Sequence, residues 1–312
     1  MDENVRVFRL EERGLPQTVD IVMWAKDGAA FLPFTLKRIS EVLPEKVVHE
    51  KIFVDDHSVD ESASIADSFG WSVYDNPSGG IGGGFKEALK HVDCPFFASF
   101  EQDLLLSRKW WPTVPLLMRK KRVVVAQGWR LPSHPVLNAI EKVTVDFKPV
   151  IGAPLYSIDN NVYETEVIRK LAGGLEKFHY AVDSVLLARI LDAGFTWVTE
   201  QSVLSIHLKP VGFAEYIRGR YGAARMAEYF TLASRKQLPP SEVEKFTFKH
   251  VATRLAISPL VGLALSYVKR QPWLSIYYPM LRIQLFKSFK EWIKIEGNKK
   301  TVKHVTRNGS QT

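Results

Sequence analysis

The stretch Lys51-Ile-Phe-Val-Asp-Asp-His-Ser-Val-Asp60 joins a short apolar run to a turn that carries three carboxylates. The β-branched and aromatic residues of its first half are typical of a buried strand. Asp55 and Asp56 repel each other at the end of that strand unless a ligand or a donor group binds them. The helix expected to begin near residue 60 could be capped by Ser58 or Asp60 alone. This favours ligand binding over capping for Asp55 and Asp56.

Strands alternate with helices on both sides of this stretch. Strands are expected over residues 19–24, 51–54, 71–74 and 94–100, and helices over 31–43, 61–69 and 84–91. Such alternation indicates βαβ units, and therefore an α/β fold with a mostly parallel sheet flanked by helices. Ligands of these sheets bind at the carboxyl ends of the strands, so the residues after each strand form the candidate site.

Polar or glycine-rich segments follow the other three strands. Lys26-Asp-Gly28 follows the first strand, and Gly79-Gly-Ile-Gly-Gly-Gly84 follows the third. The glycine segment could let the backbone approach a phosphate at a helix N-terminus, with Lys86 nearby, or it could be a flexible turn. Glu101-Gln-Asp103 follows the fourth strand. Its two carboxylates could hold a hard divalent cation, or they could belong to an ordinary capped turn.

Two further residues could take part in chemistry. Asp183 precedes a helical apolar run, so it could be a helix cap or a general base. His207 ends a strand-like run that begins at Val203, and it could be a structural histidine or a metal ligand.

The composition bounds the class of protein. With 312 residues, 46% hydrophobic and 24% charged, the chain is long and apolar enough to bury a core without metals or disulfides. Cys94 is the only cysteine, so no internal disulfide can form. Residues 1–14 are charged throughout, which predicts that they are no secretory signal and favours a cytoplasmic protein.

The charge is divided unevenly along the chain. From Lys209 onward the net charge is +13, whereas the preceding residues carry −5. Such asymmetry favours binding to a polyanionic surface, either nucleic acid or an anionic membrane. The uncharged runs 255–268 and 271–281, the second with Trp273, are each shorter than the about 20 apolar residues of a spanning helix. They predict helices in a membrane interface, or else a soluble subdomain or a dimer contact.

The order and spacing of these segments resemble the family-two glycosyltransferases of the GT-A fold. Val54–Asp60 and Gly80–Lys86 most resemble the dolichyl-phosphate-mannose-synthase branch and its polyprenyl-linked relatives. The resemblance implies a GT-A, Rossmann-like domain over residues 1–230, with a nucleotide-sugar half over about 17–120 and an acceptor half over about 121–230. Residues 231–312 would form a basic, mainly helical C-terminal extension.

The resemblance also implies roles for individual residues. The nucleotide-sugar would contact Ala25, Lys26, Asp27, Asp55, Asp56, Gly80, Lys86 and Gln102. Asp103 would be the main ligand of Mg²⁺ or Mn²⁺, with Glu101 and His207 as further ligands. Asp183 would be the catalytic carboxylate, while Arg218, Arg220 and Arg225 would lie near acceptor phosphates. The chain departs from the family pattern at Trp24-Ala-Lys-Asp27, at Glu101 in the first acidic position and at Val182.

The implied activity is inverting, hexosyltransferase-type transfer of a sugar from a nucleoside-diphosphate sugar. A glycan or a polyprenyl-phosphate-type compound would be the acceptor, as in glycan biosynthesis. An anionic membrane surface on the cytoplasmic side is an expected partner, and a homo-oligomer is an option. The alternatives are an inactive scaffold or a nucleic-acid-binding protein that uses the basic tail. The sequence contains no recognisable nucleic-acid-binding module, so no nucleic-acid partner is expected.

Overall fold

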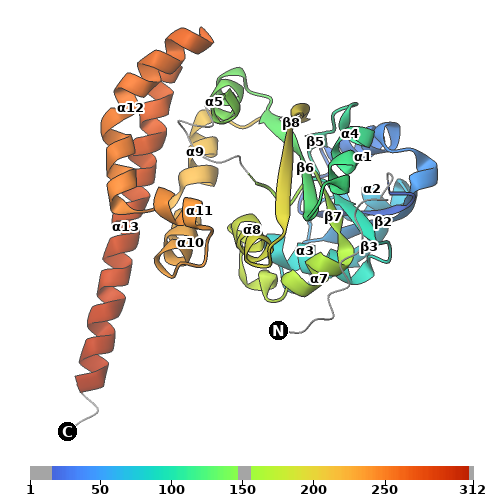
Figure 1. Cartoon of the computed structure of the whole chain (residues 1–312), viewed down its shortest axis with the longest axis horizontal. Coiled ribbons are helices and arrows are strands. Elements are labelled where there is room, and N and C mark those ends of the chain that lie inside the picture. The colour runs from blue at the N-terminus through green and yellow to red at the C-terminus, as the bar shows by residue number, and fades with distance from the viewer. Residues whose placement is uncertain (1–15, 147–155, 309–312) are drawn as a thin grey trace. The chain divides into compact units, whose positions relative to one another are not determined.

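An eight-stranded mixed sheet organises the amino-terminal two-thirds of the chain, in the order β3-β2-β1-β4-β7-β6-β8-β5 (Figure 1). Its strands are β1 (Val19–Ala25), β2 (Val48–Asp55), β3 (Ser72–Asp75), β4 (Phe96–Ser99), β5 (Leu104–Leu105), β6 (Val123–Pro132), β7 (Asn161–Glu164) and β8 (Thr196–His207). Four of the seven pairings are parallel and three, β4–β7, β6–β7 and β5–β8, are antiparallel. The expected mostly parallel sheet is confirmed.

The structure, a computed structural model, describes residues 16–146 and 156–308. The charged stretch 1–14, on which the expectation of no secretory signal rests, lies outside these residues. The helices are α1 (Leu32–Val42), α2 (Ser62–Ser68), α3 (Gly80–His91), α4 (Trp110–Leu116), α5 (Pro135–Asp146), α7 (Thr165–Leu171), α8 (Val182–Asp192), α9 (Phe213–Tyr221), α10 (Ala223–Ser234), α11 (Pro240–Lys245), α12 (Phe248–Lys269) and α13 (Leu274–Asn308). The expected α/β fold with a helical C-terminal region is confirmed.

The chain forms two compact units. The first is Met1–Ser133 with Pro154–Pro210, and the second is His134–Ala153 with Val211–Thr312. All the candidate catalytic, nucleotide-sugar and metal residues belong to the first unit. Residue 230, where the sequence analysis places a domain boundary, lies within α10 of the second unit.

Side chains of β1 alternate between two buried layers, because successive residues of a strand point to opposite faces. Ile21 and Met23 pack into a core with Leu36 of α1 and Trp110 of α4. Trp24 points the other way and meets the Phe85 ring of α3 edge-on, with 5.5 Å between the ring centroids. The sheet is therefore covered on both faces, which leaves the carboxyl ends of its strands as the place for a site.

The second unit is helical. Its helices α9 and α10 are separate because Gly222 between them has an extended backbone. A buried Glu141 carboxylate of α5 accepts a hydrogen bond from the Tyr216 hydroxyl at 2.6 Å and pairs with Arg220 at 3.1 Å. Arg220, expected near acceptor phosphates, thus has a structural partner.

Helix α12 is longer than the uncharged run that predicts it. The helix continues through Pro259 and includes Lys249 and Arg254 in its first two turns, so it has 22 residues where the uncharged run 255–268 has 14. By length and composition alone, α12 could cross a membrane. The expectation that this region is too short to span a membrane was therefore wrong about the length of the helix.

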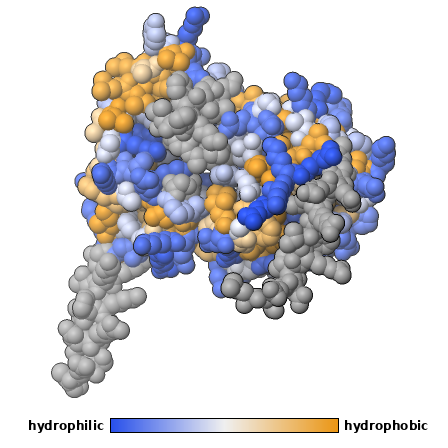
Figure 2. Space-filling view, in the orientation of Figure 1, coloured by the Kyte–Doolittle hydropathy of each residue, from blue (hydrophilic) through white to orange (hydrophobic). Residues whose placement is uncertain are grey.

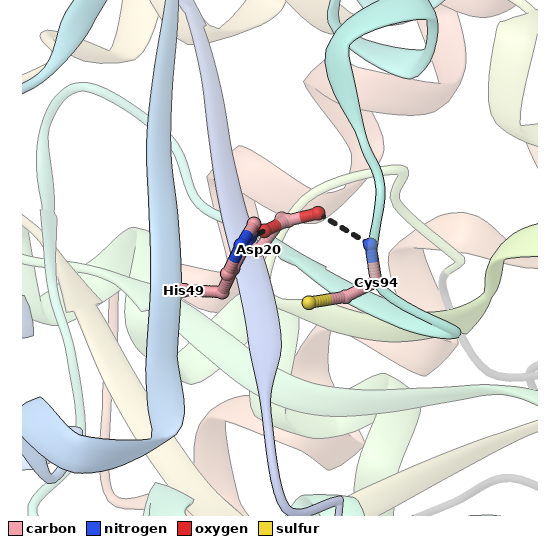
Figure 3. A group of neighbouring side chains, drawn as sticks. All are labelled: Asp20, His49 and Cys94. Atoms are coloured by element: carbon pink, nitrogen blue, oxygen red, sulfur yellow. Dashed lines mark hydrogen bonds and ion pairs between the residues drawn. The ribbon is translucent and has the colours of Figure 1, made fainter.

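A buried carboxylate ties three segments together at the amino-terminal edge of the sheet (Figure 3). Asp20 is fully buried, and its Oδ1 lies 2.8 Å from Nδ1 of His49. Its Oδ2 accepts the backbone N–H groups of Asp93 and Cys94, both at 2.7 Å. A carboxylate, an imidazole and a thiol thus lie within 4.8 Å of one another. Since both Asp20 oxygens are engaged by the protein, the group acts as a structural clamp.

This clamp predicts a pH dependence of stability. The hydrogen bond to Asp20, followed by the charge of Asp20, raises the pKa of His49. A group with a raised pKa stabilises the fold fully below its unfolded pKa, about 6.5, and loses that contribution as the pH rises through its folded pKa. Wild type should therefore lose more thermal stability than His49→Gln between pH 5.5 and pH 8.5 when both are followed by circular dichroism. A difference in melting temperature between wild type and His49→Gln that is the same at all pH values would contradict the prediction.

Candidate functional site

The loops after β1, β2 and β4 meet at one edge of the sheet, because β1 lies between β2 and β4 and runs parallel to both. The Gln102 side chain joins the first loop to the third. Its Oε1 accepts the Lys26 N–H at 2.8 Å and its Nε2 donates to the Lys26 carbonyl at 2.9 Å. Gln102, predicted to contact the nucleotide-sugar, thus holds the Lys26 backbone in place.

The loops after β1 and β2 are joined by a second set of hydrogen bonds. Asp27 donates its N–H to the Ser58 hydroxyl and accepts the Val59 N–H through Oδ1, both at 2.9 Å. The Ala25 carbonyl accepts the Asp56 N–H at 2.8 Å. The structure therefore brings Ala25, Lys26, Asp27 and the acidic pair to one rigid edge, as the sequence predicts for a nucleoside cradle.

The two adjacent carboxylates after β2 have different surroundings. Asp56 Oδ1 accepts the Gly80 N–H at 2.9 Å and a donor of the Asn76 amide at 2.8 Å, so it holds the start of α3. Asp55 Oδ2 accepts the Ser58 N–H at 3.0 Å. Its Oδ1 is buried and has no hydrogen-bond partner among the described residues. A buried acceptor left without a donor is costly, so Asp55 is the better placed of the pair to accept from a ligand.

The glycine-rich segment is part of a helix and not a loop. Helix α3 begins at Gly80, four residues earlier than the sequence suggests. A Cβ on Gly82 would lie 2.1 Å from the Leu175 carbonyl oxygen, and one on Gly84 would lie 2.5 Å from Cβ of Trp24. The glycines thus let α3 pack closely against its neighbours. The alternative of a flexible turn was therefore wrong, whereas the approach of the backbone to a phosphate at the helix N-terminus stays a prediction.

This close packing predicts a large loss of stability in Gly82→Ala. Its Cβ would meet two backbone oxygens, of Leu175 at 2.1 Å and of Phe178 at 2.7 Å, which cannot move aside by rotating a side chain. Overpacking of this kind costs about 3 kcal/mol, or roughly 10 °C in melting temperature. Gly173→Ala is the matched control, since a Cβ there meets nothing within 4 Å. Equal melting temperatures of the two variants would refute the packing role.

Two carboxylates and an imidazole gather where β4 and β8 end. Glu101 and Asp103 follow β4, and His207 is the last residue of β8. Antiparallel pairing of β5 with β8 sets Leu104 opposite His207. His207 Nδ1 lies 3.1 Å from Asp103 Oδ2, and its Nε2 lies 3.3 Å from Glu101 Oε2. The three residues that the sequence predicts as metal ligands are thus brought together, with ligand atoms within 4.8 Å of one another.

The electrostatics of this cluster favour a cation between the carboxyl groups. Burial lowers the pKa of His207, but the charge of Glu101 and hydrogen bonds to Asp103 and Glu101 outweigh it and raise this pKa to about 9. Burial also opposes ionisation of Glu101, yet the charges of Arg130 and His207 lower the pKa of Glu101 to about 2. At neutral pH the cluster therefore holds an imidazolium against an ionised carboxylate.

Sequence reasoning missed two residues that complete the cluster. Arg130, on β6, lies 2.6 Å from Glu101 Oε2 through Nη1. Asp159 interacts with Glu101, and its Oδ1 is buried without a hydrogen-bond partner among the described residues. Burial, and next the charge of Glu101, raise the pKa of Asp159 well above its ordinary range. The signal for Arg130 was available, since it is the one charged residue of an otherwise uncharged strand, Val123–Pro132.

The donor set fits a divalent cation. Two carboxylates and one imidazole can coordinate Mn²⁺, whereas Mg²⁺ takes mostly oxygen ligands and water. Without a metal, the protonated His207 balances the negative charge of the carboxylates at the place where such a cation would bind. A bound metal would require that proton to leave, because a ligating imidazole must be neutral. Glu101 also forms an ion pair with Arg130, whereas Asp103 is paired with His207 alone among the described residues. Asp103 and His207 are therefore the better placed of the three to bind a cation.

The remaining predicted residues, Asp183 and Lys86, lie on helices α8 and α3. Asp183 is the second residue of α8, so it is not the helix cap, and its Oδ1 accepts the Ser184 N–H at 2.7 Å. Lys86 lies in the middle of α3, partly buried, two residues beyond the glycine segment. Their catalytic and diphosphate-binding roles stay predictions.

Comparison with known proteins gives a fold, and a family match over part of the chain. Residues 20–171, from β1 to α7, match the family model of glycosyl transferase family 2. A search of curated protein sequences gives no match. The mannosyltransferase PcManGT from Pyrobaculum calidifontis, solved with GDP-Man and Mn²⁺, is 17% identical over 88% of this chain and 86% of that chain, with a TM-score of 0.64. Glucosyl-3-phosphoglycerate synthase from Mycobacterium tuberculosis, solved with Mn²⁺, UDP-glucose and phosphoglyceric acid, is 19% identical over 74% and 84%, with a TM-score of 0.55.

The sheet and its flanking helices thus have the GT-A fold. Residues 20–171 match the family model of glycosyl transferase family 2 on that fold. Both solved structures hold Mn²⁺, and this chain places Glu101, Asp103 and His207 together as a potential metal group. The match over residues 20–171 supports the resemblance to family two, while the dolichyl-phosphate-mannose-synthase branch stays a prediction.

Proposed function

We propose that this protein is an inverting hexosyltransferase that moves a sugar from a nucleoside-diphosphate sugar to an acceptor with the help of Mn²⁺ or Mg²⁺. The observation that carries the proposal is the Glu101–Asp103–His207 cluster at the carboxyl edge of the sheet, beside the loops after β1 and β2. The family-two match over residues 20–171 supports sugar transfer as the class of reaction.

The donor would lie along the edge formed by the loops after β1, β2 and β4. Asp55, with its buried Oδ1 lacking a described partner, would accept from a ribose hydroxyl or a base N–H. Lys86 of α3 would approach the diphosphate, which also lies toward the positive N-terminal end of that helix. Gln102 would keep the Lys26 backbone in position for the nucleoside.

The reacting centre would lie between the metal cluster and Asp183. A divalent cation held by Asp103, His207 and Glu101 would neutralise charge on the departing nucleoside diphosphate. Asp183 would take the proton of an acceptor hydroxyl as that oxygen attacks the anomeric carbon from the face opposite the leaving group. One displacement of this kind inverts the anomeric centre.

The acceptor is proposed to be a glycan or a polyprenyl-phosphate-type compound, as in glycan biosynthesis. The two solved relatives differ in donor, GDP-Man in one and UDP-glucose in the other, and phosphoglyceric acid is present in the second. The donor base therefore has to be measured and is not carried over from either relative.

A thermal-shift panel tests the proposal. Wild type would be heated with GDP, UDP, ADP, CDP and their sugars, each with Mn²⁺, with Mg²⁺ and with a chelator. A ligand that binds the native state stabilises it by about 2.7 kcal/mol at a concentration 100 times its dissociation constant. We expect nucleotides of one base to raise the melting temperature only when metal is present. We also expect the protein to release that nucleoside diphosphate when extracts that contain the acceptor are added to the nucleotide sugar. A panel without any metal-dependent shift would overturn the proposal.

A further inference from the structure

Helix α12 exposes an apolar surface that the helical unit leaves uncovered. An 18-residue window of the helix is apolar enough to cross a membrane, yet only 22% of that window is buried. A helix that is apolar all round normally lies inside a protein core or in lipid. The buried side of α12 accounts for few of its residues, namely Val251, Ser258, Gly262 and Leu265.

The exposed apolar residues of α12 form one stripe. Ile257, Leu260, Leu263 and Tyr267 recur at intervals of three and four residues, so they share one face of the helix. Leu260 is 72% exposed, Leu263 is 58% exposed and Tyr267 is 87% exposed. Figure 2 shows hydrophobic surface gathered over the upper part of the α12–α13 pair. Isolated exposed apolar residues are ordinary, whereas contiguous ones mark an interaction surface.

Helix α13 carries a similar exposed stripe. Trp273, just before the helix, and Ile276, Met280 and Ile283 within it also follow one another at intervals of three and four residues, and each is at least 41% exposed. The opposite side of α13 is already occupied. Its residues Leu274, Tyr278 and Leu281 pack into a core that includes Leu265 of α12 and Leu137 of α5. The exposed stripes are thus additional to the surface that holds the unit together.

The charge around the stripes identifies the kind of partner. Residues 245–290 contain eight Lys and Arg residues and no Asp or Glu. Lys269 and Arg270 follow the α12 stripe at the turn between the two helices, and the exposed Lys249, Lys287 and Lys290 lie toward the opposite ends of the pair. An apolar stripe that ends in cations and contains Trp and Tyr matches a bilayer with anionic headgroups, where aromatic rings lie at the interface.

The dimensions favour a helix pair lying in the plane of the membrane. Helix α12 has 22 residues, but only the 14 residues of the run 255–268 are free of charge, and at about 1.5 Å per residue that run is roughly 21 Å long. The hydrocarbon core of a bilayer is about 30 Å thick. A spanning orientation would draw the cations at one end toward the hydrocarbon, whereas in-plane binding leaves both charged ends among headgroups.

We propose that the exposed stripes of α12 and α13 form a membrane-docking surface that lies in the interface of an anionic phospholipid bilayer. Residues 257–283 supply the apolar contact, and the cations at the two ends bind the headgroups. The cytoplasmic leaflet carries the anionic lipids that such a surface needs, so the protein binds peripherally on the cytoplasmic face. This binding is independent of the proposed sugar transfer.

Flotation of the full chain with vesicles tests this surface. Vesicles of phosphatidylcholine mixed equally with phosphatidylglycerol would be compared with vesicles of phosphatidylcholine alone. We expect wild type to float with the anionic vesicles, and Leu260→Ser/Leu263→Ser to bind at least about tenfold more weakly, since each leucine gives up apolar contact with lipid. The matched control is Leu116→Ser/Leu191→Ser, which changes two exposed leucines of the first unit and should float like wild type.

Three results would overturn the proposal. Wild type could fail to float with either vesicle, or both double variants could float equally well. Wild type could also be a dimer by light scattering without vesicles while Leu260→Ser/Leu263→Ser is a monomer, which would assign the stripe to a second copy. The nucleotide thermal shift measured on the same samples keeps this test separate from that of the sugar-transfer proposal.

Discussion

Asp103→Asn is expected to abolish the metal-dependent thermal shift with nucleotide and to lower kcat/KM at least about a hundredfold. Loss of a residue that hydrogen-bonds to a metal ligand already lowers metal affinity or activity about 10–100-fold. Asp103 is itself a proposed ligand. Asparagine keeps the shape of the side chain and an oxygen that can accept from His207, 3.1 Å away in the wild type. The variant should therefore fold normally and lose mainly the negative charge that binds a cation.

Two measurements separate this effect from a structural one. The melting temperature of Asp103→Asn without ligands should stay near that of wild type, and titration with Mn²⁺ should show loss of binding. Asp67→Asn is the matched control, because Asp67 is an exposed carboxylate of α2, away from the cluster. If Asp103→Asn bound Mn²⁺ with nucleotide as wild type does, Asp103 would not be a metal ligand.

Much of the fold could be predicted because apolar runs and polar turns alternate with the periods of strands and helices. The strands expected at 19–24, 51–54 and 94–100 overlap β1, β2 and β4. The start of α3 could not be predicted, since glycine disfavours a helix and only contact with the Leu175 backbone explains it. Likewise, the full length of α12 depends on charged residues and Pro259 being tolerated within a helix.

The site was predictable where its residues follow one another in the sequence. Glu101 and Asp103 are two residues apart, so a shared site follows from their spacing. The resemblance implied His207 as a third ligand. The pairing of β5 with β8 brings His207 to the two carboxylates, and no local sequence pattern specifies that pairing. Asp159 could not be found, because only the folded chain brings it to Glu101.

Asp183→Asn should give the other large loss of activity, with a signature that differs from that of Asp103→Asn. If Asp183 deprotonates an acceptor hydroxyl, its replacement should lower kcat by about 10²–10⁴-fold. Asparagine can still accept the Ser184 N–H, so the first turn of α8 should remain intact. The nucleotide and Mn²⁺ thermal shift should remain, because Asp183 is not among the three clustered ligands. Asp192→Asn, at the exposed end of the same helix, is the control.

The size of the loss also reports on the acceptor. An acceptor phosphate is already ionised near neutral pH, so Asp183 would then orient the attacking oxygen and would not remove a proton from it. Its replacement would in that case cost much less than a hundredfold, and the loss would vary little with pH. A loss of 10²–10⁴-fold would instead assign a hydroxyl acceptor. Activity of Asp183→Asn equal to that of wild type with every acceptor would remove Asp183 from the mechanism and leave the metal cluster unaffected.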